Sequence, residues 1–332
     1  MTARAAIFAP RGTKLTGAEK AFFREADPWG FILFARNIGS ADQIRALCAD
    51  LRDTLGRDAP ILIDQEGGRV QRILPPLATR WKPPLDDVIR LGDKADRGMY
   101  LRARIIAAEL RSFGIDVNCI PTLDVADEFT HRFLRNRCYG ETPDQVTTVG
   151  RAVATGLLEG GVLPVVKHMP GHGRGRVDSH LELPFTQARV DELRSVDFVP
   201  FSALADLPLG MTAHMIFEAV DPYFPATQSG AMINLIREEL GFAGLLMTDD
   251  ISMQALSGTP GERASAAMAA GCDVVLHCNG DLTEMAQVAE AAGTLGEGAA
   301  LRASAALALR DGASEVDTKE LQAEFEMLLA GP

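Results

Sequence analysis

Short apolar runs alternate along the chain with longer segments whose apolar residues recur at helical spacing. This alternation is typical of repeated strand–helix units. Eight runs have the length of a buried strand, and they span residues 5–9, 30–35, 60–64, 115–120, 163–167, 209–214, 244–248 and 272–278. The pattern therefore predicts an α/β fold with eight strands separated by helices.

Signals for helix starts and stops fall between these runs. Ser40 is followed three residues later by Gln43, and Thr142 is followed by Gln145, which is the spacing of an N-terminal capping box. Gly114 closes a helical segment just before the fourth run, as a glycine beyond a helix C-terminus commonly does. Each signal supports one of the predicted strand–helix units.

Eight such units favour a closed (β/α)8 barrel, the TIM barrel, over an open doubly wound sheet. No linker rich in Pro, Ser or Gly divides the chain. The alanine-rich tail from about residue 298 predicts one or two helices packed on the barrel. We therefore expect residues 1–332 to form a single domain.

Composition and charge narrow the class of protein. Hydrophobic residues make up 47% of the chain and charged residues 23%, which is ordinary for a globular protein with a large core. The net charge of -12 disfavours binding to nucleic acid or to anionic lipid, because both need basic patches.

Targeting segments and disulfides are not expected either. The N-terminal apolar run is too short for a secretory signal, and no run approaches the roughly 18 apolar residues of a membrane span. The five cysteines are odd in number and lack CxxC spacing, which indicates reduced thiols. We expect a cytoplasmic monomer that binds neither nucleic acid nor membrane.

Polar residues follow seven of the eight predicted strands. In a barrel the catalytic groups lie at the carboxyl ends of the strands, so these positions are candidates for chemistry. They are Arg36, Asn37, Asp64, Glu66, Asp124, Lys167, His168, His214, Asp249, Asp250 and Asn279. Helix caps and salt bridges at the rim explain one or two of them, but not a polar group after so many strands.

The segment from Lys167 to His180 predicts a long loop, since it contains three glycines and a proline before Asp178. Asp178 and His180 are two residues apart and point the same way if the segment is extended. The carboxylate then holds one imidazole nitrogen and leaves the other to exchange a proton near neutral pH. This spacing favours an acid/base pair, and a solvated loop pair is the alternative.

Two further groups of residues suggest binding and nucleophilic attack. Asp249 ends the seventh run, so its carboxylate reaches the rim, where it can attack an electrophilic carbon. Asp250 is interpreted as the cap of a helix beginning near residues 251–253. The stretch 64–72 sets two acids and two arginines beside a double glycine, which suits hydrogen bonding to sugar hydroxyls or a salt-bridge network at the rim. Arg137 alone indicates no more than a surface charge.

The stretches IDQEGGRVQR, NRCYG, KHMPGHG with VDSH, MTAHMIF and LLMTDDISM occur in this order between about residues 5 and 290. Together they resemble the bacterial family 3 glycoside hydrolases, specifically the β-N-acetylglucosaminidases of peptidoglycan recycling (NagZ type). The resemblance implies a (β/α)8 barrel without a second domain. It also implies a retaining exo-enzyme that removes terminal β-1,4-linked N-acetylglucosamine from anhydromuropeptides through a covalent glycosyl-aspartate. We expect no cofactor and no metal.

The resemblance also implies roles for individual residues. Asp249 corresponds to the nucleophile, His180 to the general acid/base and Asp178 to the residue that orients His180. The residues implied to hold the N-acetylglucosamine ring are Asp64, Arg72, Arg137, Lys167 and His168, with His214 lining the site.

Three alternatives remain open at the level of sequence. A metal-dependent hydrolase could draw zinc ligands from His168, His172, Asp178, His180 and His214. A lyase or aldolase could use Lys167 as a Schiff-base amine, although this leaves Asp249 without a role. A sugar-binding barrel without activity is the third, and turnover of a chromogenic N-acetylglucosaminide separates it from an enzyme.

Overall fold

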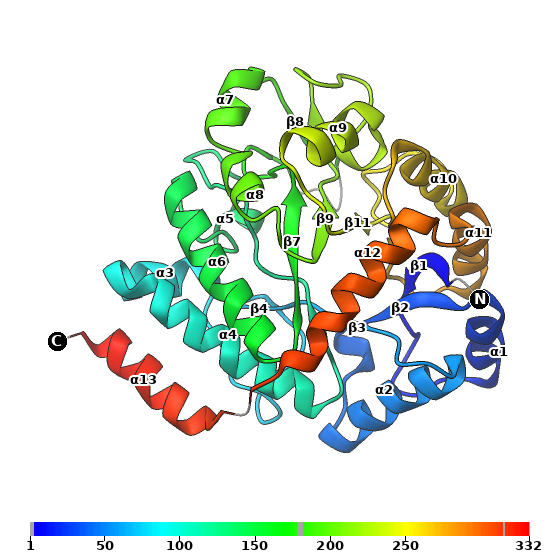
Figure 1. Ribbon diagram of the computed structural model, residues 1–332, viewed down its shortest axis with the longest axis horizontal. Helices are drawn as coiled ribbons and strands as arrows, with labels where there is room; N and C mark the ends of the chain where they lie inside the picture. The colour runs from blue at the N-terminus through cyan, green and yellow to red at the C-terminus, as the bar shows by residue number, and fades with distance from the viewer. Residues whose placement is uncertain (1–2, 178–181, 315, 332) are drawn as a thin grey trace.

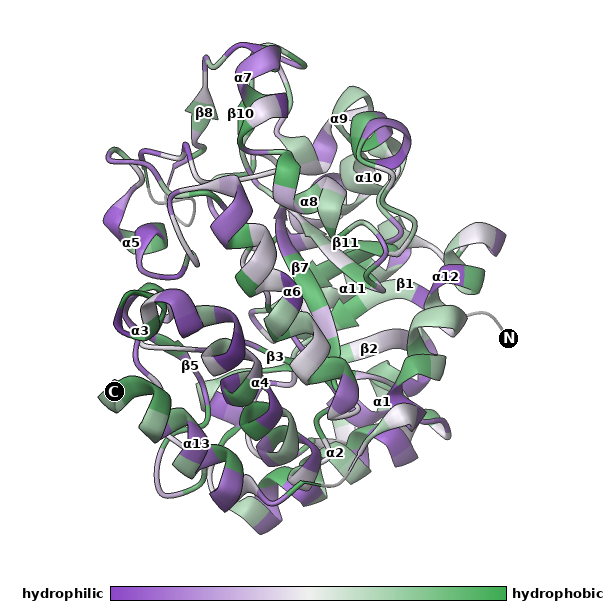
Figure 2. Cartoon of the chain, turned by 60° about the vertical axis from the view of Figure 1, so that its left-hand side comes forward, coloured by the Kyte–Doolittle hydropathy of each residue, from purple (hydrophilic) through white to green (hydrophobic). Residues whose placement is uncertain are grey.

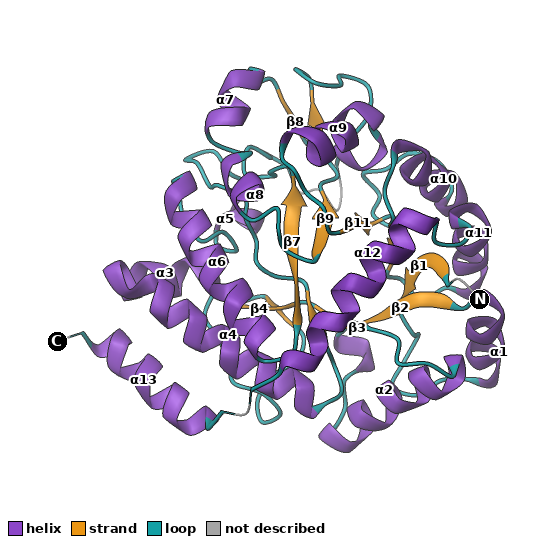
Figure 3. Ribbon diagram, in the orientation of Figure 1, coloured by secondary structure: helices purple, strands orange, loops and turns teal. Residues whose placement is uncertain are grey.

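The computed structural model describes residues 3–177, 182–314 and 316–331, so Asp178 and His180 lie outside the described residues. Eight parallel strands close into a barrel at the centre of the molecule (Figure 3). In chain order they are β1 (Arg4–Phe8), β2 (Pro28–Leu33), β3 (Ile61–Ile63), β6 (Val117–Asn118), β7 (Leu163–Met169), β9 (Leu209–Thr212), β11 (Leu245–Asp250) and β12 (Val274–His277). Each pairs with the next in this order, and β12 pairs with β1. The predicted (β/α)8 barrel is confirmed, with one strand at each of the eight apolar runs.

Helices surround the barrel (Figure 1). The longer ones are α1 (Gly17–Ala26), α2 (Ala41–Leu55), α3 (Pro84–Leu91), α4 (Ala95–Ser112), α6 (Pro143–Glu159), α10 (Pro260–Ala270), α11 (Leu282–Ala292), α12 (Glu297–Ala308) and α13 (Thr318–Ala330). Four short helices are α5 (Arg132–Arg135), α7 (Val190–Ser195), α8 (Val199–Ala203) and α9 (Gly230–Asn234). The last two long helices fall in the alanine-rich tail, where one or two helices were expected, and α13 packs against α4.

The barrel strands form the core, because nearly every strand side chain is removed from water. Hydrophobic residues concentrate on the strands, whereas hydrophilic residues are frequent on the outer helices (Figure 2). Burial of this apolar surface is the main force that holds helices on the barrel. Within the described part of the chain, no helix combines the length and the apolar character needed to cross a bilayer.

The helix signals are met in part. Ser40 and Thr142 are the N-caps of α2 and α6, and their hydroxyls accept from the backbone N–H of Gln43 and Gln145. The reciprocal half of the capping box is absent at Ser40, because the Gln43 side chain accepts from the N–H of Gly39 instead. Gly114 follows α4 with a positive φ of 83°, as a glycine at a helix end should.

The prediction of a helix that begins near residues 251–253 is wrong. Residues 251–256 form turns, and α10 begins only at Pro260, where Thr259 provides a complete capping box. Asp250 still acts locally, since its carboxylate accepts from the N–H and the hydroxyl of Ser252. An aspartate two residues before its partner stabilises a turn as readily as a helix start, so the sequence signal did not separate the two.

Two small sheets extend beyond the barrel. The antiparallel pair β4 (Gln65–Gly67) and β5 (Val70–Gln71) follows β3 directly. At its turn Gly67 has φ 115°, and a side chain there would collide with the guanidinium of Arg102 and the carbonyl of Lys82. The second pair, β8 (Phe185–Thr186) and β10 (Ile216–Phe217), is parallel. The first pair matters for the site because it returns the chain toward Asp64.

Candidate active site

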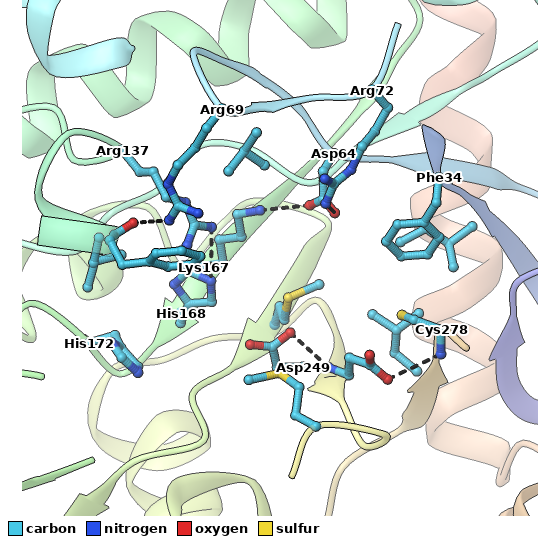
Figure 4. Close-up of a pocket in the computed structure, with 18 of the residues that line it drawn as sticks. Phe34, Asp64, Arg69, Arg72, Arg137, Lys167, His168, His172, Asp249 and Cys278 are labelled. Atoms are coloured by element: carbon cyan, nitrogen blue, oxygen red, sulfur yellow. Dashed lines mark hydrogen bonds and ion pairs between the residues drawn. The ribbon is translucent and has the colours of Figure 1, made fainter. Parts of the chain in front are cut away.

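A pocket of about 240 Å³ lies at the carboxyl ends of the barrel strands (Figure 4). This is smaller than the roughly 300–1,000 Å³ of sites for drug-sized ligands, so it suits one small polar group such as a single sugar ring. Six of the residues expected in the site line it together, namely Asp64, Arg72, Arg137, Lys167, His168 and Asp249. Val177, the last described residue before Asp178, also lines the pocket.

Acidic and basic side chains alternate along one wall of the pocket. Asp64 accepts from the ammonium of Lys167 at 3.0 Å and from the guanidinium of Arg72 at 3.0 Å. Glu66 accepts from Lys167 at 2.7 Å and from two nitrogens of Arg137 at 2.9 and 2.8 Å. Lys167 thus joins both acids in one ionic chain, in which each side chain fixes the position of its neighbours. The order along the chain is Arg72, Asp64, Lys167, Glu66 and Arg137. Arg137 is therefore a mostly buried residue that lines the pocket and not a surface charge.

The charges in this chain stabilise one another. Burial by itself would raise the pKa of both carboxyls, but the nearby cations hold the pKa of Asp64 well below its usual range and lower that of Glu66 to about 2. Burial by itself would lower the pKa of Lys167, but Asp64 and Glu66 raise it. All members are charged at neutral pH, with three cations and two anions. A Schiff-base lysine needs a neutral amine, so this setting disfavours the lyase alternative.

Glu66 is one of the two acids of the stretch 64–72, for which the sequence indicates either sugar binding or a salt-bridge network, and the resemblance implies no separate role for it. Its side chain is fully buried and does not line the pocket, so it acts through Arg137 and Lys167. A usable signal was present in the sequence. Asp64 and Glu66 are two residues apart where the chain is extended, so both side chains point to the same face.

His168 has a defined orientation. Its Nδ1 lies 2.8 Å from a carboxylate oxygen of Asp124, which accepts from it, and its Nε2 lies 3.5 Å from Arg137 on the pocket side. The other oxygen of Asp124 accepts from the backbone N–H groups of His168 and His172. Burial would raise the pKa of Asp124, but His168 lowers it to about 2. Asp124 therefore holds the ring of His168 and the start of the loop that follows.

Asp249 lies near the end of β11 and faces Lys167 and His168 across the pocket (Figure 4). One carboxylate oxygen accepts from the N–H of Asp250 at 2.8 Å. Burial would raise its pKa, but His214, His168 and this N–H lower it below the ordinary value. Asp249 is ionised at neutral pH, as a carboxylate nucleophile must be.

Asp250 differs from its neighbour although both end the same strand. Besides Ser252, its carboxylate accepts from the backbone N–H of Cys278 at 3.1 Å, which ties β11 to the end of β12. The two adjacent acids therefore have separate surroundings, and the carboxylate of Asp250 is held by protein donors.

His214 does not line the pocket, which differs from the expectation. It is fully buried, with Nδ1 at 2.8 Å from the hydroxyl of Thr227 and Nε2 at 3.0 Å from the backbone carbonyl of Asp250. Both ring nitrogens are thus used within the protein, so the ring supports the backbone next to Asp249. The sequence could not show this because Thr227 is 13 residues further along the chain.

The zinc alternative loses part of its ligand set. His214 has no nitrogen left to bind a metal, because both ring nitrogens are hydrogen-bonded within the protein. Among the residues the structure describes, no three His, Cys, Asp or Glu side chains are grouped to hold a metal ion. Of the remaining ligands of that hypothesis, His172 keeps both ring nitrogens unbonded among the described residues, and Asp178 and His180 lie outside them.

Comparisons with known proteins agree with this geometry. The family model for the glycosyl hydrolase family 3 N-terminal domain matches residues 14–306, which include all barrel strands except β1. A β-hexosaminidase from Methylococcus capsulatus is 37% identical over 272 residues, covering 81% of this chain and 80% of that protein.

Two solved structures extend the likeness to the fold. A family 3 β-N-acetylglucosaminidase from Paenibacillus sp. superposes with a TM-score of 0.87 at 28% identity, covering 98% of this chain and 67% of that one. NagZ from Neisseria gonorrhoeae, in complex with N-trifluoroacetyl-D-glucosamine, has a TM-score of 0.83 at 28% identity. In that case 99% of this chain and 97% of the other are covered.

Proposed function

The chain belongs to glycosyl hydrolase family 3, and from this premise we propose that it is a retaining exo-β-N-acetylhexosaminidase that releases terminal β-linked N-acetylglucosamine. The observation that carries the proposal is an ionised, partly buried Asp249 that faces a wall of fixed charges across a pocket the size of one sugar.

The wall supplies the groups that a sugar ring needs. Asp64 offers carboxylate oxygens to hydroxyl donors, and Arg72, Lys167 and Arg137 offer donors to hydroxyl oxygens. Because these side chains already hold one another in place, little reorganisation accompanies binding. We assign Asp64, Arg72, Arg137, Lys167 and His168 to the subsite for the terminal N-acetylglucosamine.

The reaction proceeds in two displacements at C-1. In the first, Asp249 attacks C-1 while His180 gives a proton to the departing oxygen, and a glycosyl ester with Asp249 forms. In the second, His180 takes a proton from water as the water attacks C-1 and releases Asp249. Two inversions return the β configuration.

A histidine suits the acid/base role. Its ordinary pKa of about 6.5 allows proton exchange at neutral pH without the burial that a carboxyl requires. Asp178 orients the ring and stabilises the imidazolium, as the acid of a catalytic triad does. Both assignments rest on the family resemblance of the segment VDSH.

The natural substrate we propose is N-acetylglucosamine β-1,4-linked to an anhydromuramoyl sugar, with or without its peptide. This places the enzyme in the recycling of cell-wall peptidoglycan in the cytoplasm, as a monomer whose residues 1–332 form one domain. Support comes from the resemblance over residues 5–290 and from a pocket whose wall matches the sugar rather than a peptide.

The test combines His180→Ala with two kinds of leaving group. Protonation matters most for a sugar alkoxide and least for a nitrophenolate, so the variant should lose far more rate on the natural disaccharide. Azide needs no base, so it should restore turnover of the nitrophenyl substrate and give the β-glycosyl azide. Equal losses on both substrates, or an α-azide product, would contradict the proposed mechanism.

A further inference from the structure

His172 is a buried histidine that the reaction described above does not use. It is 6% exposed, it lines the pocket, and neither of its ring nitrogens has a hydrogen-bond partner among the described residues. Buried polar groups are almost always bonded in folded proteins. A fully unbonded imidazole in a pocket wall therefore indicates a partner supplied by the ligand.

The surrounding backbone fixes the position of this ring. The N–H of His172 donates to Asp124 at 2.7 Å, and the ring centroid lies 5.7 Å from that of His168. On the other side, a side chain at Gly175 would come within 2.9 Å of the imidazole. Gly173 is equally constrained, because a side chain there would collide with the carbonyl of Val125. The described part of the loop, which ends at Val177, encloses the ring without offering it a hydrogen bond.

The protonation state of His172 suits a neutral partner. Burial, followed by the nearby His168, lowers its pKa to about 4, and the charge of Asp249 opposes this only in part. At neutral pH the ring therefore carries one N–H donor and one nitrogen acceptor. A secondary amide likewise carries an N–H donor and a carbonyl acceptor, so it complements a neutral imidazole. Sugar hydroxyls at the charged wall instead find their hydrogen-bond partners in Asp64 and the cations.

The position of His172 limits which part of the sugar it faces. Asp249 must be close to C-1, and Asp64 and Arg72 lie on the opposite side of the pocket from His172 (Figure 4). His172 lies beside His168 and close enough to Asp249 to interact with its charge, so it is on the C-1 side of the pocket. The substituent on C-2, the carbon next to C-1, is the group that remains on this side.

We propose that His172 recognises the 2-acetamido group of the terminal sugar through a hydrogen bond, and that it is the residue by which the enzyme distinguishes N-acetylglucosamine from glucose. This inference rests on the proposed function and adds a specificity determinant to the same site. It concerns binding of the substrate and not transfer of a proton.

The experiment compares 4-nitrophenyl N-acetyl-β-glucosaminide with 4-nitrophenyl β-glucoside for the wild-type enzyme and three variants. His172→Ala should reduce kcat/KM on the first substrate by about tenfold or more, the effect of losing one buried hydrogen bond, and change the second less than about threefold. His172→Asn and His172→Gln place an amide near the position of Nδ1 or Nε2. One of them should restore much of the preference.

A matched control is His277, another buried histidine with one unbonded ring nitrogen, which does not line the pocket. His277→Ala should leave the ratio of the two kcat/KM values unchanged. Binding of free N-acetylglucosamine, measured by calorimetry, gives a readout that does not depend on turnover and should weaken about tenfold in His172→Ala.

The possible outcomes are distinct. If the wild-type enzyme cleaves the N-acetylglucosaminide but His172→Ala slows both substrates equally, or slows neither, the role of His172 is refuted and the proposed function stands. If the wild-type enzyme cleaves neither substrate and binds no N-acetylglucosamine, the proposed function itself fails. Thermal unfolding of each variant verifies that the protein being assayed is folded.

Discussion

Acids bonded to arginine side chains occur at both ends of the barrel, and they differ in the groups that form their other hydrogen bonds. At the carboxyl end, Asp64 and Glu66 accept hydrogen bonds from the side chains of Lys167, Arg72 and Arg137. Four of these five residues line the pocket. The network therefore presents charge to a ligand.

At the opposite end, two aspartates precede barrel strands and connect them. Asp116, before β6, accepts from the N–H of Ile61 in β3 at 2.7 Å and from Arg310 at 2.5 Å. Asp273, before β12, accepts from the N–H of Leu246 in β11 at 2.9 Å. Its other partners are the guanidinium groups of Arg237 and Arg302. These acids use backbone donors to join neighbouring strands.

The difference shows how one kind of interaction serves two purposes in this fold. Asp116 and Asp273, at the amino ends of strands, each accept a backbone N–H group from a neighbouring strand and so hold the barrel together. Asp64 and Glu66, at the carboxyl end, are bonded by side chains that also face the pocket, so they prepare it for a ligand. This division agrees with the separation of stability and activity between the two faces of TIM barrels. It also predicts separable effects of mutation.

The largest expected effect is on activity alone. Asp249→Ala removes the nucleophile, so kcat/KM should fall by about 10⁴-fold or more, as for nucleophiles in other hydrolases. Thermal unfolding should occur at the same temperature or higher, because an ionised and partly desolvated carboxylate is lost. Steady-state rates on the nitrophenyl substrate and a melting curve measure both. Residual activity within about a hundredfold of wild type would exclude Asp249 as the nucleophile.

The next test compares the loss of one acid at each end of the barrel. Asp64→Ala should reduce kcat/KM by about 10- to 100-fold, because charge-assisted hydrogen bonds to the sugar are lost. Asp273→Ala should lower the free energy of unfolding by about 1–3 kcal/mol, because the buried N–H of Leu246 and two partly buried guanidinium groups lose their partner, while kcat/KM per folded molecule stays within about threefold. Denaturant titrations and kinetics on both variants provide the comparison. A crossed result, with Asp273→Ala inactive but stable, would refute the division.

The smallest expected effect is on acid stability. The pKa values of Glu66 and Asp124 are lowered to about 2 from ordinary values of 4.5 and 3.8. Groups with a lowered folded pKa stabilise the protein above their unfolded pKa, and that contribution is lost as the pH falls. The melting temperature should therefore drop between about pH 4.5 and 2, and Glu66→Gln should make this decline shallower. An identical pH profile for Glu66→Gln would show that the ionic chain contributes nothing to acid stability.

The fold was predictable to a large extent, because strand–helix alternation is local and repeats eight times along the chain. Asp64, Lys167, His168 and Asp249 followed from their positions at the ends of strands, whereas Arg137 did not. What the sequence could not show depends on contacts between distant segments. His214 is turned to Thr227 and Asp250, Glu66 is hidden behind Arg137 and Lys167, and the enclosure of His172 depends on loop geometry.

In the proposed mechanism, hydrolysis passes through an ester between the sugar and Asp249. Mass spectrometry of the intact protein and its peptides, after exposure to a slow fluorinated N-acetylglucosaminyl donor, tests it most directly. If the ester forms on Asp249, the spectra will show one glycosyl label, located on the peptide that contains Asp249, and no label in Asp249→Ala. A label on Asp250 would contradict the assignment of Asp249 as the nucleophile. So would the absence of any adduct together with strong inhibition by a thiazoline of N-acetylglucosamine, because attack would then come from the acetamido group of the substrate.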